Sequence, residues 1–199
     1  MAEVDARWQR AGPAPRGDAA ALDSRFRSAG EAARRFLVDR ARHDWHATCD
    51  ALLAKLALCE EFEQTPAGVP AQATLEQRWA EQPVLPAAWE QELARRAGLI
   101  RAAQGGSSPV AASADDLLLQ LEAALQLDSP PDFEAARREL KLRAMKAALE
   151  SRRSTAPAPL APDQLLAALL GRTALDDRQR ERLGKVVAAV RERGPTGAG

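Results

Sequence analysis

The sequence predicts an all-α protein without a β-sheet, extended in outline and built on one long helix over about residues 18–64. Three observations favour this fold class. The segment 18–64 contains no proline and only one glycine, Gly30. Its apolar residues recur at spacings of three and four, which is the helical period. The 46% hydrophobic content is rich in alanine and includes only 4% aromatic residues, so we expect a thin core spread along helices.

The long helix carries two apolar rows with heptad spacing, each typical of a coiled-coil seam. The first is Leu22, Phe26, Ala29, Ala33 and Phe36, and the second is Trp45, Cys49, Leu52, Leu56 and Cys59. The two rows are out of phase, which predicts a stutter between them. Asp18 is a candidate N-cap. Gly30 costs about 1 kcal/mol in a helix interior relative to alanine, and it permits a bend or break there.

Two shorter amphipathic helices are expected over 71–81 and 86–103, separated by Pro83 and Pro86. An antiparallel return of both along the second half of the long helix would bury Trp79 and Trp89. This arrangement predicts a helical hairpin unit over residues 1–103.

The rest of the chain divides at segments rich in glycine, serine and proline, which favour linkers. Residues 104–114 form the first linker, and the Ser113–Asp116 segment that ends it has a capping-box pattern. The expected elements beyond it are a helical pair over 115–153, a proline-rich linker over 154–162, a C-terminal helical pair over 163–193 and a disordered tail over 194–199.

Charge and cysteine content limit the function classes. The 28 basic and 28 acidic residues balance, so there is no long-range attraction toward nucleic acid or an anionic membrane. Cys49 and Cys59 on one helix would lie about 15 Å apart along the axis, too far for a disulfide. The N-terminus lacks the apolar segment of a signal peptide, and no apolar run approaches the roughly 18 residues of a membrane span. We expect a soluble cytoplasmic protein with reduced thiols and no membrane partner.

Several segments resemble the sequences of a known family. They are Trp8–Arg16 (WQRAGPAPR), Leu22, Arg25–Arg27 (RFR), Cys49–Asp50, Lys55 and Leu58–Glu61 (LCEE). Together they resemble the repeat of a bacterial family called domain of unknown function 349, and Leu118–Arg153 is similar to the C-terminal module of its proteobacterial members. The resemblance implies a helical fold, comprising the last repeat unit of a longer arrangement plus that module, and no secure activity. Typical members carry an aromatic residue where this chain has Asp23.

The residue types that carry chemistry are sparse. His43, His46 and Cys49 follow one another at steps of three, and a zinc ion could be shared by neighbours one turn apart, with Asp50 as a fourth ligand. Each step rotates the side chain about 60° backward, so the three converge poorly on one ion. The favoured interpretation is a seam cysteine flanked by exposed histidines. We identify no catalytic residue and no cofactor site, and we predict that the protein is not an enzyme.

The favoured function is a non-catalytic interaction or scaffold protein, because the seam over residues 22–41 lacks a partner helix. A second copy or another protein would cover it. The candidate interaction residues are Trp8, Arg10, Arg16, Leu22, Phe26, Arg34 and Phe36. The alternative is a nucleic-acid- or ribosome-associated regulator that uses the arginine-rich first half, although alternating charges also favour a solvated helix surface. For Trp8, packing of the N-terminal segment onto the long helix is favoured over ligand binding.

Overall fold

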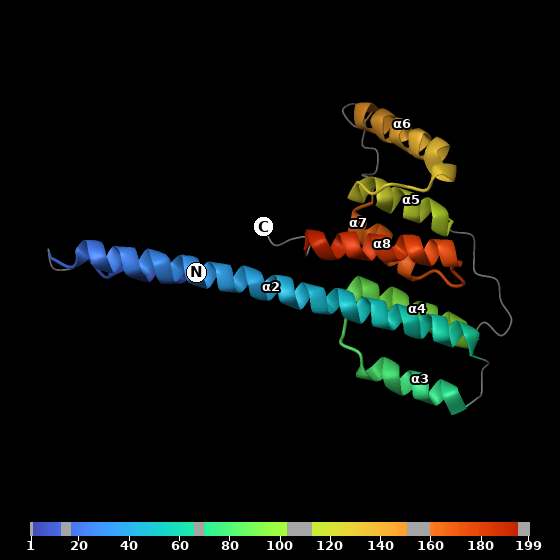
Figure 1. Cartoon of the computed structure of the whole chain (residues 1–199), viewed down its shortest axis with the longest axis horizontal. Helices are drawn as coiled ribbons and strands as arrows, with labels where there is room; N and C mark the ends of the chain where they lie inside the picture. The colour runs from blue at the N-terminus through green and yellow to red at the C-terminus, as the bar shows by residue number, and fades with distance from the viewer. Residues whose placement is uncertain (1, 13–16, 66–69, 103–112, 151–159, 195–199) are drawn as a thin grey trace. The chain divides into compact units, whose positions relative to one another are not determined.

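The computed structural model describes residues 2–12, 17–65, 70–102, 113–150 and 160–194, and every regular element in these residues is a helix (Figure 1). The predicted all-α class without a sheet is confirmed. The chain divides into two compact units, Met1–His46 and Ala47–Gly199. Predictions for the linkers at 104–112 and 154–159 and for the tail at 195–199 lie outside the described residues.

The first unit contains α1 (Ala2–Arg10) and the first half of α2 (Ala19–Gln64). The predicted long helix is therefore confirmed, within one residue at its start. It continues without a break through Gly30, where an added Cβ would touch only the Arg34 side chain, at 3.7 Å. The buried residues of α2 all belong to its second half, in the second unit; they are Cys49, Ala51, Leu52, Lys55, Leu56, Leu58, Cys59 and Phe62.

In the second unit, α3 (Pro70–Glu81) returns along the second half of α2, as the hairpin prediction requires. Its apolar face packs on Phe62 and neighbouring residues. The Phe62 and Trp79 rings meet edge to face, with centroids 6.5 Å apart, and Leu75 is buried against the same cluster. An isolated helix of twelve residues would be only marginally stable in water, so α3 depends on this contact for its stability.

The next helix, α4 (Ala87–Ala102), runs parallel to α2, and the prediction of an antiparallel return is wrong for it. The direction follows from two ion pairs that advance together along both helices. Lys55 Nζ lies 2.7 Å from each carboxylate oxygen of Glu90, and Arg96 donates to Glu63 at 2.8 and 3.0 Å. The short connection between α3 and α4 reverses the chain a second time, which restores the direction of α2.

The remaining core contains α5 (Ala114–Leu125), α7 (Pro162–Leu170) and α8 (Asp177–Arg193). α5 packs against both α7 and α8, and α7 also packs against α4. The predicted capping box at the start of α5 is confirmed, since the backbone N–H of Asp116 donates to Ser113 Oγ at 3.1 Å and the reciprocal bond is present. α5 therefore joins the C-terminal helical pair through its leucine-rich face.

A buried ion cluster fixes α8 on α5. Arg182 and Glu122 are each 3% exposed and share two hydrogen bonds of 2.6 and 3.0 Å. Arg182 also donates to Asp115 at 2.6 Å and lies 4.3 Å from the ring of Phe133. Burying charges is costly unless their hydrogen bonds are satisfied, so this pair requires the observed register of the two helices.

The segment after α5 forms the short 3-10 helix η1 (Pro131–Phe133) and then α6 (Glu134–Glu150). Arg137 anchors this segment by donating to the Leu127 carbonyl at 2.5 Å and to Ser129 Oγ at 2.8 Å. The side chains described for α6 include no buried residue. α6 is thus held at its N-terminal end and contributes little to the core.

Ion pairs at two points align α8 with α2 in the antiparallel sense. Arg191 pairs with Asp50 at 2.7 Å, and Arg180 pairs with Glu60 at 3.4 Å. None of the described helices combines the length and apolar character needed to cross a membrane.

We predict that removing Arg182 destabilises the second unit. Arg182→Ala leaves the Glu122 carboxylate buried without its partner, which should cost about 3–5 kcal/mol. The double variant Arg182→Met, Glu122→Leu removes both charges and should recover most of this loss. Urea unfolding followed by circular dichroism measures both values. Lys185→Ala, which breaks an exposed pair with Glu181, is the control and should change stability by less than about 0.5 kcal/mol. Equal losses in the Arg182→Ala and double variants would contradict this account.

Candidate functional site

In the first unit, α1 folds back against the first half of α2. The Trp8 ring stacks on Phe26 with centroids 4.3 Å apart and an angle of 8° between the planes. The Trp8 indole N–H donates to Asp23 Oδ1 at 3.3 Å, and Asp5 pairs with Arg34 at 3.7 Å. Because Trp8 lies near residues 23–26 while the earlier Asp5 reaches Arg34, α1 is antiparallel to α2. The contact agrees with the favoured interpretation of Trp8 as a packing residue.

The α1 contact is thin. No residue of α1 is buried. The ring stack adds about 0.5–1.5 kcal/mol, and a solvent-exposed ion pair about 0–1 kcal/mol. Against this, ordering each residue of the backbone costs about 1–2 kcal/mol, and a nine-residue helix is too short to be stable alone. The free energy that holds α1 on α2 is therefore small.

Phe26 begins a row on α2 that continues beyond the residues α1 contacts. Phe26, Gly30, Ala33 and Leu37 follow one another at spacings of four, three and four, which places them on one helix face. The first three are half-buried, whereas Leu37 is 51% exposed. We call these four residues the Phe26 row. One face of α2 thus changes from partly covered to bare within three turns.

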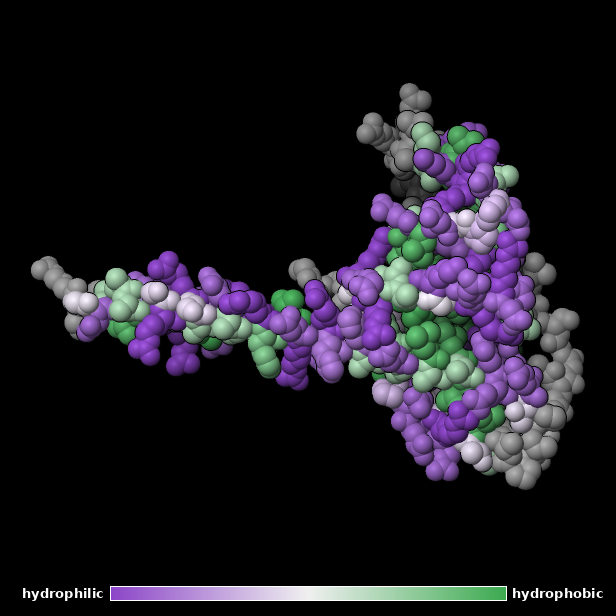
Figure 2. Space-filling view, viewed as in Figure 1, coloured by the Kyte–Doolittle hydropathy of each residue, from purple (hydrophilic) through white to green (hydrophobic). Residues whose placement is uncertain are grey.

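Phe36 and Val38 flank Leu37 and are 64% and 59% exposed. We call Phe36, Leu37 and Val38 the Phe36 patch. Figure 2 shows hydrophobic side chains at the surface of this half of α2, among hydrophilic ones. Large apolar residues exposed singly are normal in soluble proteins. Phe36, Leu37 and Val38 point about 100° apart around the helix, so they form an apolar band around α2, and Leu37 is the member that continues the face of the Phe26 row.

The predicted interaction residues fall into different environments. Trp8, Phe26 and Arg34 meet in the α1–α2 contact. Leu22 and Phe36 are exposed. On α2, the α1 contact at Phe26 and Arg34 thus lies between two exposed apolar residues, Leu22 and Phe36.

The other two predicted residues lie elsewhere. The Arg10 guanidinium donates to the Ala6 carbonyl of its own helix at 3.3 Å, and Arg16 lies outside the described residues. Asp5 and Asp23, which hold α1 through Arg34 and Trp8, were absent from the predicted set. Nothing in the local sequence distinguishes these two aspartates from the other acidic residues of a mixed-charge helix.

The three candidate metal ligands have unequal access to solvent. His43 is exposed, His46 is half-buried and Cys49 is buried. Among the described residues, no group of three histidine, cysteine or acidic side chains could hold a metal ion. Burial raises the pKa of the Cys49 thiol, the main cause of its shift, so the thiol stays protonated and unreactive at neutral pH.

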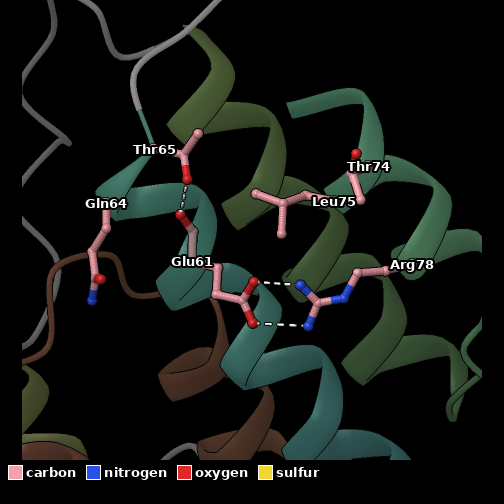
Figure 3. A pocket seen from close by; sticks show the side chains of 6 residues that line it. All are labelled: Glu61, Gln64, Thr65, Thr74, Leu75 and Arg78. Carbon is pink, nitrogen blue, oxygen red and sulfur yellow. Dashed lines mark hydrogen bonds and ion pairs between the residues drawn. The ribbon is translucent and has the colours of Figure 1, made fainter. Parts of the chain in front are cut away.

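An open hollow of about 310 Å³ lies in the second unit between the end of α2 and α3 (Figure 3). Glu61 and Arg78 point toward each other across it and share hydrogen bonds of 2.5 and 2.9 Å. The Thr65 hydroxyl donates to the Glu61 carbonyl at 2.7 Å, and Thr74 and Leu75 line the α3 side. The carboxylate and guanidinium neutralise each other, and the lining lacks a nucleophile paired with a base. This hollow therefore offers no arrangement for acid–base or covalent catalysis.

A second hollow, of about 270 Å³, lies between α5 and α6. Its lining includes Leu119, Leu140 and the Glu139–Arg143 ion pair, which spans 2.5 Å within α6. Here too the facing charges are neutralised locally, and the apolar residues are leucines and an alanine. Neither hollow presents a reactive site.

Comparison of the chain with family models, curated proteins and solved structures finds no match. The resemblance to the domain of unknown function 349 family stays a prediction that depends on the residues quoted above. Asp23 stands where typical members of that family carry an aromatic residue. In this structure its carboxylate accepts the hydrogen bond from the Trp8 indole N–H.

We predict that the Glu61–Arg78 pair stabilises the contact between α2 and α3 in a pH-dependent manner. The pKa of Glu61 is lowered, first by the hydrogen bond from Arg78 and also by its charge. A lowered folded-state pKa means that the stabilisation is present above the unfolded value of about 4.3 and is lost as the pH falls through the folded value. Glu61→Gln should therefore lower the urea midpoint slightly at neutral pH and leave it unchanged in strong acid. A difference that persists in acid would show that the carboxylate charge is not the cause.

Proposed function

We propose that this chain is a non-catalytic helical interaction protein that associates through the first half of α2. The observation that carries the proposal is the Phe36 patch, which exposes three consecutive large apolar side chains on a helix. On the preceding turns of the same helix, α1 already packs against the Phe26 row. The free surface is thus continuous with an interface between two helices, so the occupant that fits it is another helix.

We propose a second copy of this chain as the source of that helix. Each copy carries a helix with the same mixed-charge surface and the same bare row, and two copies could cover each other about a two-fold axis. The chain itself also supplies one helix, α1, that packs on this row. If the chain does not self-associate, the alternative partner is a different protein that supplies an amphipathic helix.

The expected affinity is modest. Complete burial of a large apolar side chain gives about 1.5–3 kcal/mol, so covering the exposed parts of the patch should give roughly 3–5 kcal/mol per copy. Association costs about 4–15 kcal/mol in lost freedom of motion. Two copies together gain about 6–10 kcal/mol, so the net free energy is at best about −6 kcal/mol, and we expect a weak dimer with a Kd of tens of micromolar or higher.

The buried thiols of Cys49 and Cys59 support a reducing, cytoplasmic location as part of the same proposal. The resemblance to a bacterial family without a secure activity is also compatible with a binding role.

We predict concentration-dependent dimerisation that requires the Phe36 patch. The double variant Phe36→Gln, Leu37→Gln removes apolar area while glutamine keeps a good helix propensity. Sedimentation velocity should give a Kd at least about tenfold weaker than that of the wild type, since two lost contacts exceed 1.4 kcal/mol. Val84→Gln is a matched control, because Val84 is 85% exposed in the second unit. A wild-type chain that stays monomeric at millimolar concentration would reject self-association.

An arginine surface on the same half of α2 supports the alternative of nucleic-acid binding. Arg25, Arg35 and Arg42 make no ion pair within the described part of the chain, whereas Arg34 and Arg40 pair with aspartates. Three unpaired guanidinium groups on one helix could contact successive phosphates. The near-balanced charge of the chain weakens this candidate.

Filter binding with single-stranded RNA and duplex DNA tests the alternative. Three phosphate contacts predict that the logarithm of the binding constant falls with the logarithm of salt concentration with a slope of about −2 to −3. Arg35→Ala, Arg42→Ala should lose most of this slope, and Lys185→Ala in the second unit should not. No retention on the filter even at low salt rejects nucleic-acid binding.

A further inference from the structure

We propose that α1 is a displaceable strap: it occupies the Phe26 end of the Phe26 row in the isolated chain and leaves α2 when a helix of a second copy of this chain docks there. The inference rests on the proposed function, because it describes how the same surface is regulated. In this proposal, α1 competes with the incoming helix for the same face of α2.

The first argument is steric. Two helices in contact lie about 8–10 Å apart along their axes, so a given face of α2 accepts one partner at a time. The Trp8 ring covers Phe26 in a parallel stack. An incoming helix that follows the row from Leu37 back toward Phe26 must displace Trp8 to use the whole row.

The second argument concerns the polar contacts that hold α1. The Trp8–Asp23 hydrogen bond and the Asp5–Arg34 ion pair are both open to solvent. When α1 leaves, water replaces both partners, and no charge is left buried without a partner. The Arg182–Glu122 pair in the second unit is the opposite case, because both of its side chains are 3% exposed. The polar interactions that hold α1 can therefore be replaced by interactions with water at little cost in free energy.

The third argument concerns the surface of α2 that becomes exposed when α1 leaves. Release of α1 exposes Phe26 and extends the bare surface from the Phe36 patch by about two turns of α2. The added segment has one large side chain, Phe26, next to two small residues, Gly30 and Ala33. Small residues let a second helix approach closely beside an aromatic anchor.

A peptide of residues 2–12, which contains α1, is the probe for this proposal. It is labelled with a fluorophore and titrated into the full chain in wild-type and Trp8→Ala forms. The substitution loosens the resident strap, so the Trp8→Ala chain should bind the peptide severalfold more tightly than the wild type. Val4→Ala is the control in the chain, since Val4 is on α1 and exposed, and it should match the wild type. A peptide carrying Trp8→Ala should not bind.

Equal binding of the peptide to both chains, or binding to neither, would overturn the proposal. Adding Phe26→Ala to the Trp8→Ala chain should abolish binding, and retained binding would place the peptide elsewhere. Circular dichroism at each step checks that the long helix remains folded.

The same chains separate the strap from the proposed function. Phe36→Gln, Leu37→Gln should weaken self-association at least about tenfold and leave peptide binding to the Trp8→Ala chain within about twofold. If the chains bind the peptide but never self-associate, the function fails and the strap stands. If the wild type self-associates and Trp8→Ala does not strengthen its dimer severalfold, α1 does not compete and the strap fails.

Discussion

The structure depends on cover for the apolar face of α2. A helix of 46 residues with an apolar face cannot be stable by propensity alone, so other helices must exclude water from that face. α3 and α4 do this for the second half, aligned by Lys55–Glu90 and Glu61–Arg78. Within the described part of the first unit, α1 is the helix that packs on the first half of α2. The helical order of this first half therefore depends on propagation from the covered half together with the small contribution of the Trp8 stack.

Charge has a different role in the two units because burial differs. The second unit is rich in alanine and leucine, and such cores define helix register weakly, since small side chains interlock poorly. The buried Arg182–Glu122 pair and the buried Lys55, which pairs with the half-buried Glu90, define the register, because a shifted helix would leave a buried charge without its partner. In the first unit the pairs are exposed and impose no such penalty. The same residue types therefore specify one arrangement in the second unit and permit exchange in the first.

Local signals in the sequence are sufficient for the long helix and for the Ser113–Asp116 capping box, because both depend on residues within a few positions of each other. The direction of α4 was missed because it depends on Glu90 and Arg96 meeting residues more than thirty positions earlier. The packing of α5 with α7 and α8 is likewise tertiary. For the candidate site, Trp8 and Phe26 could be chosen as aromatic residues on helix faces. Leu37 could have been found from its spacing to Ala33, whereas Asp23 and Asp5 carry no such signal.

The exposed Phe36 patch is not explained by the folding of this chain. Its residues keep 51–64% of their surface exposed within the described structure, and replacing them with polar helix formers would not lower helix propensity. In contrast, Cys49 is buried and Glu61 is paired with Arg78. The described surface of α2 offers apolar area to another molecule. Water is excluded from that area when a partner covers it, which is the physical reason for proposing that this chain binds another helix.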